Sequence, residues 1–575
     1  MNNREMADKF EAVAQFLEIK GEAIYRVLAY RKAAEALRDL SRDVAVIREE
    51  GNLEDIPGVG KAIAAKIEEM IDSGNLGYYE ELAAEIPPDL LEMLAVDGVG
   101  PKRAAQFWQE AGILSLTELE AAAREGRLRE LSGMGVRLEQ KILSSIEAYK
   151  HRQTDRFLLG QAWDTAQSLE ERLSKVEGVE QIELAGSLRR YRETVGDLDI
   201  VAGTGAPGLL LDTFSTMPEV ERILGKGDTK VSVELYSGLK VQLWAHPREH
   251  FGSALQYATG SQAHNVRLRE FALRQGLSLS EHGFKTEEGE LIECPREEDV
   301  YCELGLPWIP PEMREDRGEI EAAQEGALPE LIRVEDLLGE LHAHSTWSDG
   351  KASIAEMASA AKELGMKYLV ISDHSQSLGV AGGLTAAELK QQKTEILEVQ
   401  AEIGSGIELL QGSEVEILAG GGLDFDDEVL GSLDIVIASL HTALQQDRET
   451  ATQRVLNAIE NSFVHIIGHL TGRLIGKRDP ADLDLERIFM AAVEHNVILE
   501  INAHPDRLDL KDTHARRALD LGCLLAINTD AHHPSHLGFR HFGVGTARRA
   551  WARPEQIVNT WSLASLREWL SSRRL

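Results

Sequence analysis

The chain has few cysteines and no long apolar run, and both absences exclude classes of protein. Its 575 residues include only three cysteines, Cys294, Cys302 and Cys523. They are too few and too widely spaced for a disulfide framework. No segment approaches the ~20 consecutive apolar residues of a membrane helix, and the start MNNREMADKF lacks the apolar core of a signal peptide. We therefore expect a folded, cytoplasmic protein with no membrane partner.

Positive charge is also scarce. Lysine and arginine contribute 61 residues against 96 aspartates and glutamates, which gives a formal net charge of −35. This balance argues against a protein that coats nucleic acid through bulk charge, so any recognition of phosphate has to be local. The length is several times the ~100 to 200 residues of an ordinary domain and therefore predicts several domains.

Residues 1 to about 150 show helical periodicity, interrupted by three similar turns. Each turn consists of an apolar residue, a G-x-G step and a helix, and the three lie at 56–67 (IPGVGKAIAAKI), 96–108 (VDGVGPKRAAQFW) and 131–142 (LSGMGVRLEQKI). Glycines such as Gly58, Gly60, Gly98 and Gly100 allow positive φ and a close backbone approach, so the following helix can direct free N–H groups at a phosphate. One copy is equally consistent with an ordinary helix-turn-helix joint. Three copies favour sequence-independent binding to the DNA backbone.

Residues 151–315 mix short strands with helices. Strands are expected at IELAGS, LDIVAG, VSVELY and LKVQLW. Asp197 and Asp199 are two residues apart, which puts both carboxylates on one strand face, where they can share magnesium ions that bridge a nucleoside triphosphate. A lone D-x-D pair is more often a solvated strand end. Three further segments support the catalytic interpretation: GDTK (227–230), YATGS (257–261) and NVRLR (265–269). Clustered prolines and an acidic stretch then predict a linker at 316–335.

The final 240 residues predict a parallel α/β structure, because short apolar runs alternate with helical segments. Seven such runs are GELHAH, YLVISDH, ELLQGSE, IVIASLH, VHIIGH, VILEINA and LLAINTDAH. Six of the seven end in a histidine or a carboxylate. In a barrel of parallel strands the C-terminal strand ends converge on one face, so these side chains would gather there.

Nine imidazole or carboxylate side chains are the candidates for this gathering: His342, His344, Asp349, His374, Glu414, His441, His469, Asp530 and His532. A single buried histidine is more often a core residue than a ligand, but nine such groups favour a site for two or three divalent ions. Clustered ions activate water toward phosphorus and neutralise the departing oxygen, so phosphoester hydrolysis is the natural chemistry. The remaining histidines of this region keep a structural interpretation: His465, His495, His504, His514, His533, His536 and His541.

The motifs resemble two known families. H-x-H, SDG, ISDHS, G-x-E-V, AS-x-H, IGH-x-TGR and TDAH are similar to the polymerase and histidinol phosphatase (PHP) domain. GSLRR and GDLDI, with the three segments above and the helical beginning FLEIKGEAIYRVLAYRKAA, resemble an X-family DNA polymerase of the DNA polymerase beta type. Joined in this order, they make nearly the whole chain similar to bacterial X-family DNA polymerases with a C-terminal PHP domain.

The resemblance implies a multidomain α/β protein that acts as a monomer. Its parts would be a helical helix-hairpin-helix domain (1–85), a second helix-hairpin-helix subdomain (86–150), a nucleotidyltransferase palm and thumb of α+β type (151–315), the linker (316–335) and a distorted (β/α)7 PHP barrel (336–575).

The PHP resemblance implies a trinuclear centre of manganese or zinc. One ion would be surrounded by the catalytic set His342, His344, Glu414 and Asp530, a second by Asp349, His374 and His532, and a third by Glu414, His441 and His469. Arg473 in the TGR segment is a candidate phosphate contact, although arginines are common on protein surfaces.

The polymerase resemblance implies a magnesium site with one ligand replaced. Asp197 and Asp199 would be catalytic and bind both magnesium ions, Ser187 and Arg190 would hold the triphosphate, and the nucleotide and template pocket would be lined by Tyr257, Gly260, Asn265 and Arg269. The family's third carboxylate belongs at Gln242, whose amide cannot act as a base at neutral pH. We expect poor primer extension unless a neighbour such as Glu234 substitutes. Ala258 stands where the family usually has an aromatic residue, which leaves a thinner sugar-discriminating wall.

Lys66 matches the lysine that forms a Schiff base with a 5′-deoxyribose phosphate in DNA polymerase beta. The ordinary alternative is a solvated lysine on a helix face.

The predicted function is therefore DNA repair, including base excision repair. The chain would bind gapped, nicked or 3′-terminal DNA and deoxynucleoside triphosphates, and its PHP domain would act as a metal-dependent 3′-to-5′ exonuclease. Three alternatives stay open: a working gap-filling polymerase with an accessory nuclease, a DNA-end-binding scaffold with both centres silent, and a small-molecule phosphatase of the histidinol phosphatase type.

Overall fold

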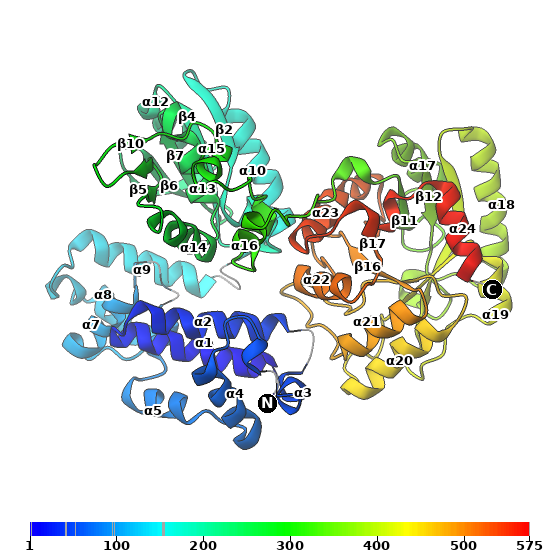
Figure 1. The fold of residues 1–575 in the computed structure, drawn as a ribbon, viewed down its shortest axis with the longest axis horizontal. Coiled ribbons are helices and arrows are strands. Elements are labelled where there is room, and N and C mark those ends of the chain that lie inside the picture. The colour runs from blue at the N-terminus through cyan, green and yellow to red at the C-terminus, as the bar shows by residue number, and fades with distance from the viewer. Residues whose placement is uncertain are drawn as a thin grey trace. The chain divides into compact units, whose positions relative to one another are not determined.

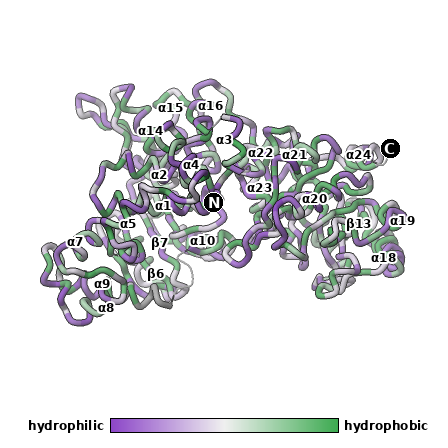
Figure 2. The backbone as a smooth tube through the Cα atoms, turned by 90° about the horizontal axis from the view of Figure 1, so that it is seen from below, coloured by the Kyte–Doolittle hydropathy of each residue, from purple (hydrophilic) through white to green (hydrophobic). Residues whose placement is uncertain are grey.

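The computed structural model divides the chain into two compact units, Met1–Asp155 and Arg156–Leu575 (Figure 1). It describes residues 1, 3–40, 43–51, 53–94, 96, 98–151 and 156–573. Hydrophilic and hydrophobic residues are interspersed along the backbone of both units (Figure 2). Within the described ranges, no helix is long and apolar enough to cross a membrane.

The first unit is helical, as expected. Its helices are α1 (Asn3–Lys20), α2 (Ile24–Asp39), α3 (Val44–Glu49), α4 (Lys61–Ser73), α5 (Gly77–Glu85), α6 (Leu90–Met93), α7 (Pro101–Ala111), α8 (Leu116–Arg124) and α9 (Val136–His151). Apolar side chains at helical spacing, such as Phe10, Phe16 and Leu17 on α1, are fully buried in a single core that extends to Ile146.

The three glycine turns have the same backbone in all three copies. The first glycine has positive φ (Gly58 83°, Gly98 93°, Gly133 72°). The residue after it donates to the carbonyl three residues earlier at 2.9 to 3.0 Å (Val59 to Ile56, Val99 to Val96, Met134 to Leu131). The second glycine directly precedes α4, α7 or α9. α4 and α9 therefore begin with free N–H groups beside a glycine, whereas α7 begins with Pro101, which has no N–H. Asp97 of the second turn lies outside the described residues.

A five-stranded sheet opens the second unit, with strand order β2-β4-β7-β6-β5. These strands are β2 (Val179–Leu184), β4 (Asp197–Thr204), β5 (Val220–Lys226), β6 (Lys230–Leu235) and β7 (Lys240–His246). The four expected strands lie here as β2, β4, β6 and β7. β4 and β7 run parallel and the other pairs antiparallel, while α10 (Leu159–Leu173), α11 (Gly186–Arg189) and α12 (Pro207–Ser215) accompany the sheet. The short strands β1 (Phe157–Leu158) and β3 (Thr194–Val195) pair separately.

A smaller subdomain follows. It contains α13 (Phe251–Thr259), α14 (Gln262–Leu273), β8 (Ser278–Ser280), β9 (Gly283–Lys285), β10 (Leu291–Ile292) and α15 (Glu297–Glu303), and its three strands pair in the order β10-β9-β8. Its own core includes Leu268, Phe284 and Tyr301.

Residues 316–335 are packed rather than extended as the linker we expected. They contain α16 (Glu319–Gln324), and the Glu319 side chain is buried with Oε1 2.7 Å from Nδ1 of His264. Inside the fold, Glu319 also accepts hydrogen bonds from the backbone N–H groups of Asp316 and Arg317, at 2.9 and 2.7 Å, which compensate for the water it has lost.

The last part of the second unit is a barrel of seven parallel strands that pair in sequence order. All seven expected runs form strands: β11 (Gly339–Ala343), β12 (Tyr368–Ile371), β13 (Glu408–Glu416), β14 (Ile435–Ser439), β15 (Ile466–Ile467), β16 (Ile498–Asn502) and β17 (Leu525–Asn528). A parallel bridge between Ala343 and Ala531 nearly closes the barrel.

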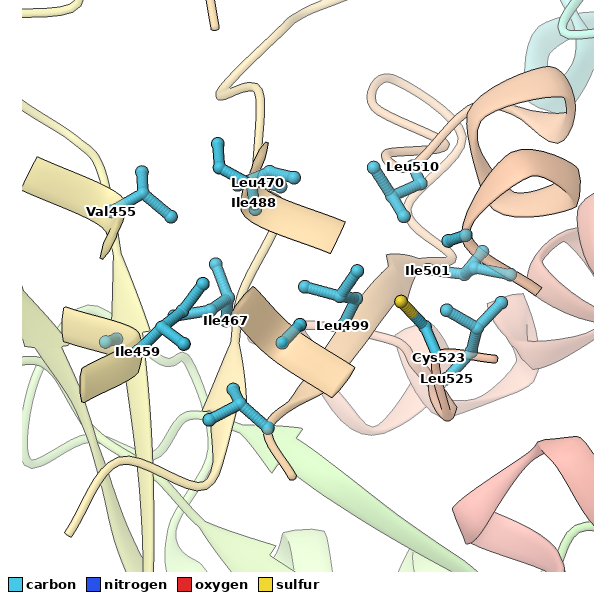
Figure 3. Close-up of a cluster of buried hydrophobic side chains, with 14 of the residues drawn as sticks. Val455, Ile459, Ile467, Leu470, Ile488, Leu499, Ile501, Leu510, Cys523 and Leu525 are labelled. Atoms are coloured by element: carbon cyan, nitrogen blue, oxygen red, sulfur yellow. The ribbon is translucent and has the colours of Figure 1, made fainter. Parts of the chain in front are cut away.

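Helices surround this barrel (Figure 1). They are α17 (Ile354–Glu363), α18 (Ala386–Ile403), α19 (Asp427–Ser432), α20 (Arg448–Glu460), α21 (Leu485–Glu494), α22 (Asp512–Asp520), α23 (Arg540–Arg549) and α24 (Leu563–Arg573). Val455 of α20 and Ile488 of α21 belong to the same buried cluster as Ile467, Leu499 and Leu525 of the strands (Figure 3). Burial of each such side chain contributes ~1.5 to 3 kcal/mol to the stability of the fold. This packing fixes the positions of the strand ends.

Buried arginines join the barrel to the preceding subdomains of the second unit. Arg549 of α23 pairs with Glu315 and Asp512, each at 2.8 Å, and donates to the backbone carbonyl of Arg190 at 2.7 Å. Arg548 pairs with Glu312 at 2.7 Å. We call the contact of Arg549 with Glu315 and Asp512 the arginine joint.

Candidate functional site

Glu414, on β13, lies at the centre of a buried nest of histidines. Its Oε2 lies 3.3 Å from Nε2 of His342 and 3.5 Å from Nε2 of His344, both on β11 or directly after it. Asp530, which follows β17, brings Oδ1 to 3.0 Å from Nε2 of His344. Carboxylate and imidazole groups from strands far apart in the sequence therefore meet, as expected for the C-terminal ends of parallel strands.

Three more imidazoles contact the two oxygens of Glu414. His374 Nδ1 lies 2.9 Å from Oε2, while His441 Nε2 and His469 Nε2 lie 3.2 and 2.9 Å from Oε1. At the edge, Asp349 Oδ1 lies 3.2 Å from Nε2 of His532 and 3.6 Å from Nε2 of His374. All nine expected side chains thus lie in one region, which we call the Glu414 nest.

The grouping within the nest differs in detail from the three expected sets. His342, His344, Glu414 and Asp530 form one group whose ligand atoms all lie within 4.8 Å of one another. The second group contains His344 in addition to Asp349, His374 and His532, and the third joins His374 to Glu414 and His441. His344 and His374 stack with ring centroids 4.4 Å apart, so each is shared between neighbouring groups. The assignment of each residue to one ion stays a prediction.

The donor set fits divalent transition ions. Both carboxylate oxygens of Glu414, Oδ1 of Asp530 and Nε2 of His342 and His344 are buried and make no hydrogen bond. Orphaned buried polar atoms are costly, because nothing replaces the water they have lost. Mixed imidazole and carboxylate ligands suit zinc and manganese. Ions bound here would satisfy these atoms.

Two carboxylates orient the ligands, and sequence reasoning missed both. Glu500 Oε1 lies 2.8 Å from Nδ1 of His342, and Glu416 Oε2 lies 2.7 Å from Nδ1 of His441. Such contacts set the tautomer, so that Nε2 presents its lone pair to the nest. A signal existed for Glu500, because it is the one charged residue in the run VILEINA.

Proximity of opposite charges shifts the pKa of several nest residues. Burial alone would lower the pKa of His441, but Glu414 and Glu416 raise it to about 9. Burial would also lower the pKa of His532, but the nearby carboxylates of Asp349 and Asp530 raise it to about 9. At His344 burial acts together with the charges of His374 and His532 and lowers the pKa to about 3. The carboxylates thus create a strongly negative centre suited to cations.

Arg473 does not have the position expected of a phosphate contact. Its Nε donates to the carbonyl of Arg507 at 2.9 Å, and Nη2 pairs with Glu193 at 2.7 Å. These partners hold the guanidinium in structural contacts. Arg507, which sequence reasoning missed, lies nearer to the nest, with Nε 3.7 Å from Oδ2 of Asp530 and a buried Nη1 that makes no hydrogen bond.

A second candidate site lies on the five-stranded sheet. Asp197 and Asp199 are on β4, and the strand register sets Asp199 opposite Gln242 of β7. The Gln242 amide donates from Nε2 to Oδ2 of Asp197 at 2.5 Å. Glu234, which we considered as a substitute carboxylate, accepts hydrogen bonds from Arg222 at 2.5 and 2.9 Å. The amide of Gln242 therefore bonds one of the two aspartates, at the position where the family resemblance predicts a third carboxylate.

Gly186, at the start of α11, allows the backbone to approach these carboxylates closely. Its φ is +62°, and a Cβ atom there would lie 2.5 Å from Oδ2 of Asp199. Only glycine combines that backbone with that approach. Burial and the charge of Asp197 raise the pKa of Asp199 to about 7. Such a carboxylate is destabilised when it is charged without a cation.

The two triphosphate candidates lie on or directly after α11. Ser187 is within the helix, and Arg190 follows it. The Arg190 guanidinium donates to the carbonyl of Thr259 and, from Nε, to Oε1 of Glu315 at 3.1 Å. Glu315 is also a partner of Arg549, so Arg190 is tied to the arginine joint.

The pocket candidates are brought together by α13 and α14. Arg269 lies with its guanidinium carbon 5.7 Å from the centroid of the Tyr257 ring. Asn265 donates to the carbonyl of Tyr257 at 2.8 Å, and Gly260, with φ +69°, ends α13. Tyr257 also packs edge-on against Trp244 of β7, at 6.1 Å between ring centroids.

In the first unit, Lys66 lies in the middle of α4. Its Nζ is 4.5 Å from the centroid of the Tyr78 ring, and the residue is half-buried. It is thus close to the first glycine turn, which ends at Gly60, the N-cap of α4.

The fold and these two sites define the class of the protein. A parallel barrel with a nest of imidazoles and carboxylates at its strand ends is a PHP-type metal-dependent phosphoesterase, and it is joined to a nucleotidyltransferase sheet and helix-hairpin-helix turns. Family models agree: Helix-hairpin-helix domain (residues 1–76), SAM-like Helix-hairpin-helix tandem (90–148), DNA polymerase beta thumb (254–315) and PHP domain (340–504).

Relatives extend this agreement over the full length. The chain is 39% identical over 574 residues to the DNA polymerase/3′-5′ exonuclease PolX of Bacillus subtilis strain 168, covering 99% of both chains. It is 26% identical to DNA polymerase lambda of Rattus norvegicus over 54% of this chain and 56% of that one. It is 30% identical to a probable phosphatase of Thermoanaerobacter sp. strain X514 over 41% of this chain and 96% of that one. The chain belongs to the PolX family of DNA polymerase/3′-5′ exonucleases.

Proposed function

We propose that this chain is a DNA repair enzyme whose PHP barrel removes nucleotides from DNA 3′ ends. The observation that carries the proposal is the convergence of nine ligand-type side chains around Glu414, whose two oxygens are buried without a hydrogen bond. Manganese or zinc ions held there would supply activation of water and neutralisation of charge on the departing oxygen.

The residues around the nest support a phosphodiester substrate. Arg507 has a buried Nη1 with no hydrogen-bond acceptor and lies beside Asp530. A guanidinium in that position would bind a non-bridging phosphate oxygen and orient the phosphorus toward the nest. Glu500 and Glu416 keep the imidazoles of His342 and His441 in the tautomer that a metal requires.

The three glycine turns would hold the DNA. Their free helix N-termini bind phosphates of the backbone without reading the bases, which suits gapped, nicked or terminal DNA of any sequence. The negative net charge of the chain makes such local contacts necessary. The polymerase-like sheet would then present the 3′ terminus that the barrel shortens.

The polymerase centre would retain binding of magnesium and deoxynucleoside triphosphates but extend primers poorly. Asp197 and Asp199 supply two carboxylates, whereas Gln242 neither ligates as an anion nor accepts the proton of the primer 3′-hydroxyl. Losing one such transition-state interaction typically costs ~3 to 5 kcal/mol, or ~10² to 10⁴ in rate.

An active gap-filling polymerase is the second candidate, because the relative from Bacillus subtilis carries both activities in its name. A small-molecule phosphatase is the third, since probable phosphatases match the barrel. Phosphatase action on a small ester would leave the glycine turns without a role.

Hydrolysis by the full chain in manganese separates these functions. A 5′-labelled single-stranded oligonucleotide should be shortened from its 3′ end, histidinol phosphate should be hydrolysed much more slowly, and Glu414→Gln should remove both activities. Faster hydrolysis of histidinol phosphate than of the oligonucleotide would overturn the proposed exonuclease. Efficient primer extension by the unmodified chain would favour the second candidate.

A further inference from the structure

Three histidines form a cluster on the second unit, separate from the Glu414 nest. His246 ends β7, His250 ends the short 3-10 helix Arg248–His250, and His282 lies in the turn between β8 and β9. One ring nitrogen from each lies within 4.8 Å of the others. The His282 ring centroid is 5.7 Å from that of His246 and 5.4 Å from that of His250.

His246 is the residue that marks this cluster as a site. It is 2% exposed, and neither of its ring nitrogens makes a hydrogen bond with any residue that the structure describes. A core histidine kept for packing alone would normally have a partner for at least one nitrogen, because an unsatisfied buried group is costly. The other two imidazoles are the groups that face it, with side chains 20% exposed at His250 and 51% exposed at His282. The cluster thus has a buried floor and an opening to solvent.

We propose that His246, His250 and His282 bind one divalent transition ion of the zinc class. Three imidazoles without a thiolate suit zinc, and also nickel or copper, whereas magnesium requires oxygen ligands. Zinc–nitrogen distances of about 2.0 to 2.1 Å need the three nitrogens closer together than 4.8 Å. The exposed His282, on a hairpin turn, is the ligand that can rotate inward.

Carboxylates at the rim complete the environment. Glu293 Oε1 lies 3.7 Å from Nε2 of His250, and Glu281 Oε1 lies 3.9 Å from Nε2 of His282. Either carboxylate, or a water molecule, can take the fourth position of a tetrahedral ion. Both add negative charge where a cation would enter.

The proposed ion would connect the polymerase sheet to the hairpin of the thumb. His246 is on the sheet, whereas His282 is on the hairpin β8–β9, which belongs to the part that matches the thumb model. His246 also stacks on Trp244 at 6.3 Å between centroids, and Trp244 Nε1 donates to Oδ1 of Asp199 at 3.4 Å. An ion at this site would therefore hold the β8–β9 hairpin against β7, the strand that carries Trp244, whose side chain contacts Asp199.

Metal counting on the full chain tests the proposal. Stripped protein is titrated with Co²⁺ and with Zn²⁺, and the tightly bound equivalents are compared between the wild type and His282→Ala. We expect His282→Ala to lose one equivalent, or to bind it roughly tenfold or more weakly, and to lose the visible absorption of the corresponding tetrahedral cobalt. His495→Ala, directly after α21, is the matched control and should keep the wild-type count. Equal counts and equal spectra for the wild type and His282→Ala overturn the proposal.

Hydrogen exchange supplies a readout that does not depend on the nest. Zinc should slow amide exchange in residues 277–286 of the wild type. In His282→Ala, zinc should leave the exchange rate of these residues unchanged. Glu414→Gln, in which the nest is altered, should still show the slowing. If zinc does not slow exchange in this hairpin of the wild type, the three histidines do not form an ion site. His282 is exposed, so its replacement leaves the core intact.

Discussion

Gln242 of β7 donates a hydrogen bond from its side-chain amide to Oδ2 of Asp197, 2.5 Å away. Asp197 and Asp199 both lie on the neighbouring strand β4. Under the proposed function, a carboxylate at position 242 would share a metal ion with Asp197, whereas the amide nitrogen of Gln242 donates a hydrogen bond to it. The contact stabilises the two-aspartate sheet face and at the same time removes a negative charge from it. This relationship is the structural basis for the proposed weakness of primer extension.

Replacing Gln242 should restore the polymerase. Gln242→Asp introduces the family's carboxylate, and we expect primer extension on gapped DNA in magnesium to rise by ~10² or more, because a base and a metal ligand are regained. Gln242→Glu keeps the size of the side chain and should give a smaller gain. Gln242→Asn is the matched control and should stay at the level of the unmodified chain. No gain with either acid would show that Gln242 is not what limits extension.

The Asp199 carboxyl should make magnesium binding at the sheet dependent on pH. Burial and then the charge of Asp197 raise its pKa to about 7, so it is protonated below that pH in the absence of metal. Protons compete with magnesium. We expect the magnesium affinity measured by nucleotide binding to fall as the pH decreases from 8 to 6, approaching tenfold per unit below 7. An affinity constant over this range would contradict the shifted pKa.

The same carboxyl should lower the stability of the metal-free fold. Its folded-state pKa lies above the ordinary aspartate value of 3.8, so the folded state binds the proton more tightly and stability falls as the pH rises between about 4 and 7. Asp199→Asn removes this penalty and should stabilise the protein at pH 8 by on the order of a few kcal/mol. Urea unfolding at pH 5 and pH 8 measures it, with the exposed Asp212→Asn as control. A destabilised Asp199→Asn at pH 8 would refute this account.

Removing metal or a nest residue should abolish 3′-end shortening. Chelation, or Glu414→Gln, should lower the exonuclease rate by ~10³ or more, because Glu414→Gln removes the carboxylate that two of the ligand groups share. Glu500→Gln alters a carboxylate that contacts Nδ1 of His342 and accepts from the backbone N–H of His469, and it should weaken metal binding by about 10 to 100-fold. Extra manganese should therefore rescue Glu500→Gln but not Glu414→Gln. Identical responses of the two variants to manganese would argue against an orienting role for Glu500.

Lys66 should form a Schiff base with the sugar of a 5′-deoxyribose phosphate. Borohydride trapping on an incised abasic substrate should link the wild-type chain to DNA, and Lys66→Ala should reduce the product tenfold or more if Lys66 is the nucleophile. Lys61→Ala, on the same helix α4, is exposed and serves as the control for DNA binding. Equal amounts of trapped product with Lys66→Ala and Lys61→Ala would show that Lys66 is not the nucleophile and is an ordinary lysine on the helix surface.

The arginine joint should contribute to stability in a pH-dependent way. Arg549→Met leaves Glu315 and Asp512 buried without this partner, which typically costs ~3 to 5 kcal/mol. Burial opposes ionisation, yet the surrounding arginines hold the pKa of both carboxyls well below the ordinary range. Their contribution is therefore present above about pH 4 to 5 and lost as the pH falls. Thermal unfolding of wild type, Arg549→Met and the exposed control Arg553→Met should show a smaller acid dependence for Arg549→Met alone.

Much of the fold could be predicted because buried parallel strands are short, continuous apolar runs. The seven barrel strands were recognisable for that reason, and their terminal histidines and acids indicated where the site would form. The glycine turns were recognisable because positive φ and a following helix restrict the residues allowed. These signals are local and need no knowledge of tertiary contacts.

The parts that could not be predicted depend on partners far away in the chain. Glu312 belongs to the acidic stretch beside the expected linker, but its partner Arg548 is 236 residues later. Glu414 and Glu416 are both glutamates on β13, so the sequence alone does not distinguish their roles. Only the fold shows that Glu416 contacts Nδ1 of His441. His246 and His250 have an H-x3-H spacing, which is common and not specific alone, and only the fold brings the hairpin residue His282 to them.

One assay tests the central claim most directly: a labelled gapped DNA incubated with manganese and all four nucleotides, scored for both shortening and extension. We predict that the wild type shortens the 3′ end with little extension, that His344→Ala abolishes the shortening, and that Asp199→Ala leaves the shortening chemistry in place. Shortening that survives His344→Ala, or strong extension by the wild type that Asp199→Ala removes, would contradict the account.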